Sequence, residues 1–372
     1  MTAGGGRSRS YAVTVAALAL VLAMLAALTP AAGSGKARPT CFGKPATIVG
    51  TNHHDVIGGT PGKDVIAALG GQDVIKSPNT RRNHGADIVC GGEGDDKITG
   101  NNERNVLIGE QGNDVIKGGP GNDLIVGDNA NPTGSVDGGT SRDNLNGTGG
   151  NDFMVGDNYA QGDAIGASPD KDIVGLDNAD VVIGDSASLR GDARGGATDR
   201  LAGADGNDLV VGDSYAPNGE ASGSGNDKST PINHKGGLNA GPGNDIAVGD
   251  NYTKTGTATG GGKDFLQAAD GGDKGIKCHA GECDDVFYGD NYSASCGPKK
   301  SVVVVLCQMR ATSGGAPDRL TSDQGADLMV GGLPNDKDLR GDGDKCKGGT
   351  GHDTAALCEF IYHDVESRLH LP

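Results

Sequence analysis

A nine-residue repeat runs through most of the chain and limits its possible folds more than any other feature. Residues 109–117 read GEQGNDVIK and residues 118–126 read GGPGNDLIV, and further copies follow the pattern G-G-x-G-x-D-x-U-x, where U is aliphatic. A short fixed period is typical of solenoids, in which each unit contacts only its neighbours. We therefore expect stacked coils instead of a single globular core.

Each position of the repeat has a physical role. Glycine at the first, second and fourth positions permits the backbone dihedrals of a tight turn. Aspartate at the sixth position supplies a hard anionic oxygen at the end of that turn. The last three residues alternate, with the eighth aliphatic, as in a short strand that buries one face. Each nonapeptide thus makes a turn and a strand, and two repeats make one coil.

Stacked coils place the sixth-position side chains in columns along two edges. The expected neighbours are Asp55 with Asp73, Asp96 with Asp114, and Asn105 with Asp123. Carboxylates stacked about 4.8 Å apart repel one another. Calcium suits the space between them, because it accepts six to eight oxygen ligands, including carbonyls, without strict geometry.

The composition supports an array that depends on cations. Glycine accounts for 68 of 372 residues, aromatic residues make up 3%, and tryptophan is absent, so a large aromatic core is excluded. The formal net charge is −17. Such a chain does not suit nucleic acids or anionic membrane surfaces, which attract Lys and Arg. It either stays disordered or recruits cations.

The repeat resembles the RTX family, also called hemolysin-type calcium-binding repeats, over about residues 50–356. The resemblance implies an all-β fold, a serralysin-like parallel β-roll or β-solenoid, with Ca²⁺ held between successive turns by sixth-position aspartates and turn carbonyls. The matching residues are Asp55, Asp64, Asp73, Asp87, Asp96, Asp114, Asp123, Asp143, Asp152, Asp199, Asp208, Asp245, Asp327, Asp344 and Asp353.

Four places depart from the family pattern. His53 stands at a fourth-position glycine, Asn105 replaces an aspartate, and Gly236 falls where an aspartate is expected before Leu238. The step from Asp172 to Asp180 is one residue short. Metal binding is least expected in these turns.

A longer repeat, D-Φ-Φ-V-G-D-N-Y (Φ is apolar), begins after residue 126. Its copies start at Asp123, Asp152, Asp208, Asp245 and Asp285, with a variant at Asp180. The spacing of the first copies corresponds to one coil plus an insert of ten or eleven residues. All inserts must leave the same edge, where we expect a fringe of loops. The loops either form a binding surface or are solvated spacers. Their Gly, Ser, Asn and Thr content favours the spacers.

The chain therefore divides into five expected segments. Residues 1–32 are a signal peptide, residues 33–49 an N-terminal linker or cap, and residues 50–126 a regular β-roll. Residues 127–340 are a β-roll with loops at one edge, and residues 341–372 a C-terminal cap.

The N-terminus predicts secretion. Arg7 and Arg9 precede an apolar run over about residues 11–28, and small residues follow at 30–33. This order is typical of a cleaved Sec signal peptide, which predicts an extracellular protein without a membrane association. An uncleaved anchor is the alternative, for which the run is short.

Eight cysteines in a secreted chain favour disulfides. We expect Cys346 to pair with Cys358 at the C-terminal end and Cys41 with Cys90 at the first coils. The other four leave three connectivities, of which pairing between neighbours is favoured. They are Cys278, Cys283, Cys296 and Cys307. Zinc at Cys278, His279 and Cys283 is an alternative that lacks a second pair of ligands.

No catalytic motif accompanies the repeats. The sequence has no H-E-x-x-H and no nucleophile elbow, and its eight histidines are scattered, so we predict that the protein is not an enzyme. Two alternatives stay open: a polysaccharide-active β-helix enzyme and a cell-surface adhesin. The basic candidates of the enzyme are Arg190, Arg194, Arg200 and Lys235. Calcium ions are the expected partners, together with an unidentified cell-wall or matrix polymer.

Overall fold

The structure is a computed structural model that describes most of residues 37–259. Backbone and side chains are described for residues 37–78, 85–139, 141–169, 172–227, 245–256 and 258–259, and the backbone of short strands between residues 238 and 369. The chain divides into two compact units, Met1–Arg38 and Pro39–Pro372, and the strands belong to the second. Among the described residues, no helix is long and apolar enough to cross a membrane.

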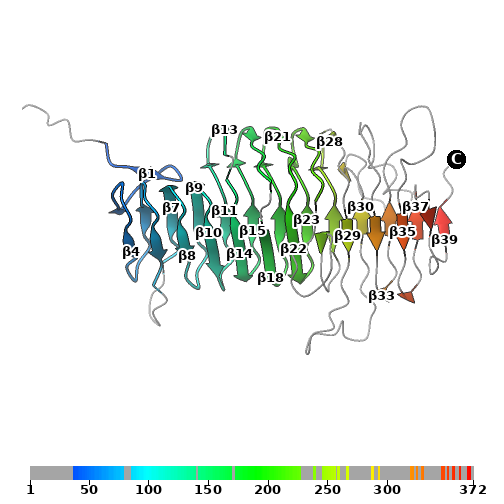
Figure 1. Ribbon diagram of the computed structural model, residues 1–372, viewed down its shortest axis with the longest axis horizontal. Helices are drawn as coiled ribbons and strands as arrows, with labels where there is room; N and C mark the ends of the chain where they lie inside the picture. The colour runs from blue at the N-terminus through cyan, green and yellow to red at the C-terminus, as the bar shows by residue number, and fades with distance from the viewer. Residues whose placement is uncertain are drawn as a thin grey trace, which may run out of the picture. The chain divides into compact units, whose positions relative to one another are not determined.

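Short strands alternate between two parallel sheets, one strand in each sheet per coil (Figure 1). The first sheet contains, in order, β3 (Ile48–Val49), β5 (Val65–Ala67), β7 (Ile88–Glu93), β9 (Val106–Gln111), β11 (Leu124–Val126), β15 (Phe153–Val155), β19 (Val181–Ile183), β23 (Leu209–Val211), β26 (Ile246–Val248), β30 (Val286–Tyr288), β34 (Leu328–Val330), β37 (Thr354–Ala356) and β39 (Ser367–Leu369). The second sheet contains β4 (Val56–Gly58), β6 (Val74–Lys76), β8 (Lys97–Thr99), β10 (Val115–Gly119), β14 (Asn144–Gly149), β18 (Asp172–Asp177), β22 (Arg200–Asp205), β25 (Leu238–Asn239), β29 (Phe265–Gln267), β32 (Arg319–Thr321), β35 (Lys345–Lys347) and β38 (Phe360–Ile361).

The strand register confirms the coil of two nonapeptides. Val56 pairs with Val74, and Lys97 with Val115, so each partner lies two nonapeptides further along the chain. The step from Val74 to Lys97 is longer, because it crosses the insertion near residues 77–83. The step from Val115 to Asn144 is longer again, because it contains the first insert. The prediction of a parallel β-roll is confirmed.

The aliphatic eighth-position residues fill the space between the two sheets. The first sheet contributes Ile66, Val89, Leu107, Ile125, Met154, Val182 and Val210, and the second contributes Ile57, Ile75, Ile98, Ile116, Leu145, Ile173 and Leu201. All but Ile57 are at most 1% exposed. One buried aliphatic side chain per strand makes a narrow continuous core, which is how a chain with so few aromatic residues folds.

The inserts are not the fringe of loops that we expected. In the described coils they form further parallel sheets, whose strands β13, β21 and β28 lie beyond the ends of the main strands in Figure 1. One of these sheets consists of β12 (Ala130–Asn131), β16 (Tyr159–Ala160) and β20 (Ala187–Ser188); another consists of β13 (Val136–Asp137), β17 (Ala164–Ile165), β21 (Ala193–Arg194), β24 (Ala221–Ser222) and β28 (Ala258–Thr259). The short sheet of β27 (Tyr252–Thr253) with β31 (Tyr292–Ser293) continues this pattern, whereas β33 (Gln324–Gly325) pairs with β36 (Thr350–Gly351) at the opposite edge (Figure 1). Successive inserts of similar length start from the same point in each coil, so they pair with each other as the main strands do.

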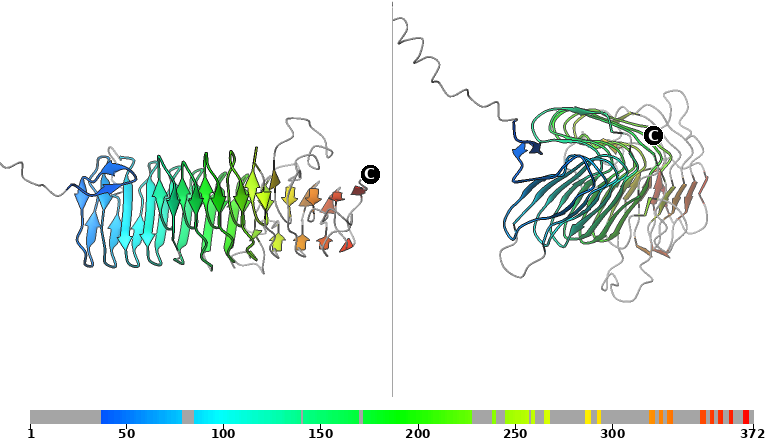
Figure 2. Two further views of the ribbon diagram at one scale, coloured as in Figure 1. Left: turned by 90° about the horizontal axis from the view of Figure 1, so that it is seen from above. Right: turned by 60° about the vertical axis from the view of Figure 1, so that its left-hand side comes forward.

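The inserts bury the outer face of the first sheet, as the arches over that sheet in Figure 2 show. Tyr215 stacks on Tyr252 with ring centroids 5.1 Å apart. Ala187 occupies the corresponding place one coil earlier, and Phe153 fills the gap, 6.0 Å from Tyr159 and 5.9 Å from Tyr215. The inserts therefore carry a second apolar core and are not merely solvated spacers.

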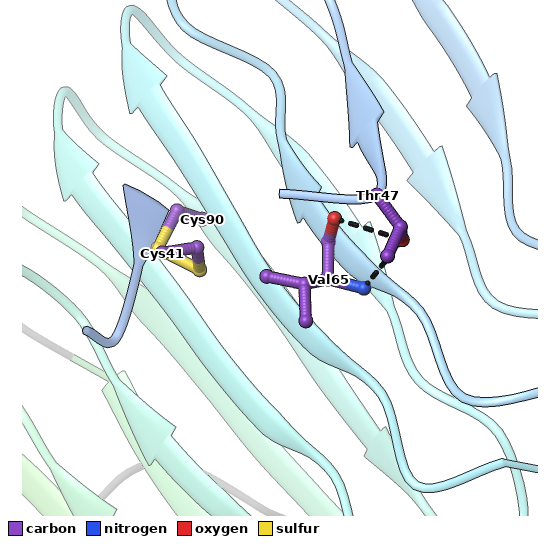
Figure 3. The surroundings of a disulfide bond; sticks show 4 residues. All are labelled: Cys41, Thr47, Val65 and Cys90. Atoms are coloured by element: carbon purple, nitrogen blue, oxygen red, sulfur yellow. Dashed lines mark hydrogen bonds between the residues drawn. A yellow bond between two sulfur atoms is a disulfide. The ribbon is translucent and has the colours of Figure 1, made fainter. Parts of the chain in front are cut away.

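An antiparallel hairpin of β1 (Thr40–Cys41) and β2 (Lys44–Pro45) covers the same face at the N-terminal end. The Cys41–Cys90 disulfide joins it to β7, with a Cα–Cα distance of 5.7 Å (Figure 3). This predicted bridge is confirmed. The side chains of the other six cysteines, and the zinc alternative at Cys278, lie outside the described residues.

Candidate calcium sites

The sixth-position aspartates form two hydrogen-bonded columns, one along each edge where the chain passes between the two main sheets. Oδ1 of Asp96 accepts the backbone N–H of Asp73 at 2.7 Å, and Oδ1 of Asp114 accepts that of Asp96 at 2.7 Å. In the other column Oδ1 of Asp152 accepts the N–H of Asp123 at 2.8 Å. Each aspartate is therefore held in place by the preceding coil.

The first edge column contains Asp55, Asp73, Asp96, Asp114 and Asp143, and later Asp199 and Asp227. The second edge column contains Asp64, Asp87, Asn105, Asp123, Asp152, Asp180, Asp208 and Asp245. The expected neighbour pairs, such as Asp55 with Asp73, lie together in these columns. Asp327, Asp344 and Asp353 lie outside the described residues.

The second carboxylate oxygen is buried without a hydrogen-bond donor at seven of these aspartates. They are Asp73, Asp96, Asp114, Asp123, Asp152, Asp180 and Asp208. Each of these residues is at most 2% exposed. A buried charged oxygen that lacks a partner destabilises a fold strongly, so native structures provide a donor or a metal ion.

Glycine at the first position makes room for a ligand beside this oxygen. A Cβ atom at Gly118 would stand 2.5 Å from Oδ2 of Asp123 and 2.7 Å from the carbonyl oxygen of Gly147 in the next coil. The same combination of an aspartate Oδ2 and a glycine carbonyl recurs beside Gly91, Gly109, Gly147 and Gly175. Carboxylate and carbonyl oxygens from two coils thus face one small volume, which fits a hard cation such as calcium.

Burial raises the pKa of these carboxyl groups well above 3.8. The pKa is about 9 for Asp114, about 8 for Asp180 and about 7 for Asp96, mainly through desolvation and in part through neighbouring carboxylates. Hydrogen bonds from the backbone oppose the shift in all three cases. At neutral pH the columns therefore need protons or metal cations to lower their charge.

In the first coils, two sixth-position carboxylates receive hydrogen bonds from neighbouring threonines. Oδ2 of Asp55 accepts the N–H and hydroxyl of Thr51 at 2.6 and 2.9 Å. Oδ2 of Asp64 accepts the N–H of Thr60 at 2.5 Å, and its Oδ1 accepts the Thr60 hydroxyl at 3.1 Å. Threonine thus supplies donors at these two aspartates.

Amide side chains do the same in the second edge column at Asp87 and Asn105. Nδ2 of Asn101 donates to Oδ2 of Asp87 at 3.0 Å. Nδ2 of Asn105 donates to the carbonyl of Glu103 at 2.7 Å and to Oδ1 of Asp123 at 3.1 Å. The replacement at Asn105 therefore places an N–H donor where the other coils carry an anionic oxygen.

Two members of the columns were missing from the residues that the repeat assigned. Asp180 lies between Asp152 and Asp208 in the second edge column. It begins a copy of the D-Φ-Φ-V-G-D motif, and this signal in the sequence could have identified it. Oδ1 of Asp227 accepts the N–H of Asp199 at 2.8 Å, the contact that an aspartate at Gly236 would have made. An insertion separates Asp227 from β25, so spacing alone did not reveal it.

These donor sets suit calcium, since hard cations prefer carboxylate and carbonyl oxygens. Each candidate site combines one or two carboxylates with backbone oxygens. Among the residues with described side chains, no three His, Cys, Asp or Glu groups gather into a metal-binding cluster.

Comparison with known families agrees with this geometry. Residues 47–76, 83–98, 99–133 and 135–158 match the model of the RTX calcium-binding nonapeptide repeat. Residues 47–158 thus contain four copies of the RTX calcium-binding repeat. The comparison with curated proteins finds no match. The aspartate ladder of the RTX repeats continues beyond them through Asp180 and Asp208 to Asp245. RTX repeats imply calcium binding, for which the two edge columns supply the oxygens.

Proposed function

We propose that this is a secreted, non-catalytic protein whose RTX repeats fold when calcium binds between successive coils. The observation that carries the proposal is the set of seven buried Oδ2 atoms without hydrogen-bond donors, from Asp73 to Asp208. A cation between coils would replace the water that these oxygens lose on folding. Calcium would then be part of the folded structure and not a surface ligand.

Binding and folding are expected to be coupled. The two oxygens beside Gly118 come from different coils, so the site exists only when the coils are stacked. An unfolded chain has no such site, and the binding free energy adds to the free energy of folding. Because each coil orders its neighbours, the transition is expected to be steep in calcium concentration.

Two features support an extracellular location. The N-terminal sequence has the layout of a signal peptide, and the Cys41–Cys90 disulfide is typical of an oxidising compartment. Extracellular calcium modules bind with dissociation constants of about 0.1 to 1 mM. Calcium outside the cell would therefore fold the chain after export.

Circular dichroism during a calcium titration tests the proposal. The full secreted chain, freed of metal by a chelator, should gain β signal with a midpoint of about 0.1 to 1 mM calcium. Magnesium at the same concentration is the control and should have little effect, because it requires stricter geometry. A full β signal in chelator, unchanged by calcium, would contradict coupled folding. Unsaturated products from uronic-acid polymers would contradict the non-catalytic part.

A further inference from the structure

Beyond residue 126, every described turn that carries an insert begins with glycine followed by aspartate. The five pairs occupy residues 127–128, 156–157, 184–185, 212–213 and 249–250. In the second edge column the residue after the same glycine varies, as Gly119, Thr148, Leu176 and Ala204 show. The start of the turn therefore does not require aspartate, which instead accompanies the inserts.

These aspartates form a third buried column beside the first edge column. Asp128 is 1% exposed, and Asp157, Asp185, Asp213 and Asp250 are 0% exposed. Their backbones stack directly, since the N–H of each of the first four donates to the carbonyl of the equivalent aspartate in the next coil at 2.8 to 3.1 Å. Five carboxyl groups thus lie one above another without access to solvent.

The inserts separate the first glycine of a turn from the aspartate that ends it. Gly109 and Asp114 belong to one nonapeptide, so the carbonyls of the few residues between them stay at the edge. Gly127 and Asp143 are much further apart in the sequence, because the chain leaves the edge and returns. Oδ2 of Asp143 and the carbonyl of Gly156 still face Gly127. The inserted turn keeps these two oxygens, and the returning chain stacks on the preceding coil again, since the N–H of Arg142 donates to Oδ1 of Asn113 at 3.0 Å.

The Asp128 side chain lies against the returning end of the insert, beside Gly139 and Ser141. Its Oδ1 accepts the hydroxyl of Ser141, while its Oδ2 is buried without a hydrogen-bond partner. Asp128 and Asp143 both act electrostatically on Asp114, whose own Oδ2 is also buried without a partner. The Asp128 carboxylate therefore lies close enough to Asp114 and Asp143 of the first edge column to interact with both electrostatically.

We propose that Asp128 and its equivalents Asp157, Asp185 and Asp213 supply an additional carboxylate to calcium sites along the first edge column. Their oxygens would add a second carboxylate beside the sixth-position aspartates of the first edge column. The inference rests on the proposed function, because it adds ligands to the same kind of site. It predicts tighter binding at these turns than at turns with one carboxylate, since the number of charged ligands tunes calcium affinity.

A purely structural role makes a different prediction. The same side chains hold the returning end of each insert: Ser168 Oγ donates to Asp157 at 2.6 Å, and the N–H of Ala197 donates to Asp185 at 3.0 Å. Asparagine keeps one acceptor oxygen for this contact but removes the charge. If anchoring is the only role, Asp→Asn leaves calcium affinity unchanged.

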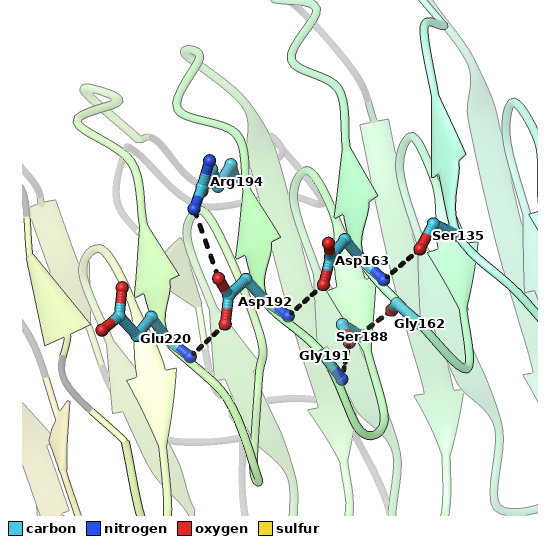
Figure 4. Close-up of polar contacts among 8 residues, drawn as sticks. All are labelled: Ser135, Gly162, Asp163, Ser188, Gly191, Asp192, Arg194 and Glu220. Carbon is cyan, nitrogen blue, oxygen red and sulfur yellow. Dashed lines mark hydrogen bonds and ion pairs between the residues drawn. The ribbon is translucent and has the colours of Figure 1, made fainter.

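Calcium titration of the full chain by isothermal calorimetry separates the two roles. Asp128→Asn and Asp185→Asn should each weaken binding to the tighter class of sites by about tenfold, or abolish one site. Asp163→Asn is the matched control. Asp163 is an exposed insert residue whose Oδ1 accepts the N–H of Asp192 at 3.0 Å (Figure 4), so its substitution should leave the titration unchanged.

A third variant distinguishes failure of this inference from failure of the proposed function. Asp96→Asn alters a turn without an insert, and loss of a site there supports coupled calcium binding itself. If Asp96→Asn weakens binding while the Asp128 and Asp185 variants do not, the additional-ligand inference is wrong and the proposed function stands. If none of the three changes binding, both are wrong. Should Asp128→Asn not fold at saturating calcium, Asp157→Asn replaces it, with the same expected weakening and the same contradicting result.

Discussion

At the scale of single residues, the calcium sites depend as much on glycine as on aspartate. Gly118 brings two oxygens from different coils together because it has no side chain. Its requirement is spatial, since any Cβ there would collide with Asp123 and with the backbone of Gly147. Glycine at this position thus makes space for the ligand, while glycines elsewhere in the repeat relieve backbone strain.

Gly118→Ala tests this spatial requirement. The added methyl group should lower the free energy of unfolding in calcium by about 1 to 3 kcal/mol, as overpacking does, and weaken calcium binding. Gly58→Ala is the matched control, because a Cβ at Gly58 meets no atom within 4 Å. Thermal unfolding at saturating calcium measures the difference. Equal stability of the two variants would show that the space beside Gly118 is not critical.

At the scale of strands and turns, the repeat predicted the coil but not everything attached to it. The nonapeptide spacing was sufficient for the strand register, because turn and strand each have a fixed length. The sheets of the inserts escaped prediction because their strands have two residues each and no aliphatic alternation. The hydrogen bonds from Thr51, Thr60 and Asn101 escaped because they come from turn positions that vary between copies.

Those local donors divide the sixth-position aspartates into two kinds. Asp55, Asp64 and Asp87 receive hydrogen bonds from neighbouring threonine and asparagine side chains, while Oδ2 of Asp152 and of Asp180 has no such donor. The Cys41–Cys90 disulfide reinforces the first kind by closing a loop across the first coils. The first coils should therefore need calcium least.

Hydrogen exchange in chelator tests this division. Peptides from residues 47–67 should keep more amide protection than peptides from residues 144–183, because Asp55 and Asp64 already receive threonine donors. Cys41→Ser should reduce the protection of the first coils and leave the later ones unchanged. Uniform exchange along the chain, with or without the disulfide, would contradict an N-terminal segment that folds with little calcium.

At the scale of the whole molecule, the described carboxylates add up to a large buried charge. The formal net charge is −17, and the columns concentrate much of the acid where water is absent. Two ion pairs of the described coils, Arg194 with Asp192 and Arg200 with Asp172, lie at partly exposed side chains and not in the buried columns. Protons and calcium ions therefore compete for the same oxygens.

This competition predicts opposite pH trends with and without calcium. Without calcium, folding raises the pKa of Asp114 to about 9, of Asp180 to about 8 and of Asp123 to about 7, so the folded state binds more protons than the unfolded state above about pH 4. The free energy of unfolding should then fall as pH rises from about 4 to about 9. In chelator, the β signal should be larger at pH 5 than at pH 8.

With calcium the trend should reverse, because protons displace the ion from the same carboxylates. The midpoint of the calcium titration is expected at higher concentration at pH 5 than at pH 8. Circular dichroism at both pH values, with a chelator matched to each pH, measures the two trends on one sample. The exposed Asp163→Asn variant controls for general charge effects and should follow the wild-type curves. If the calcium-free chain gained structure as pH rose, buried carboxylates could not be the groups that keep it unfolded, and the calcium dependence would need another origin.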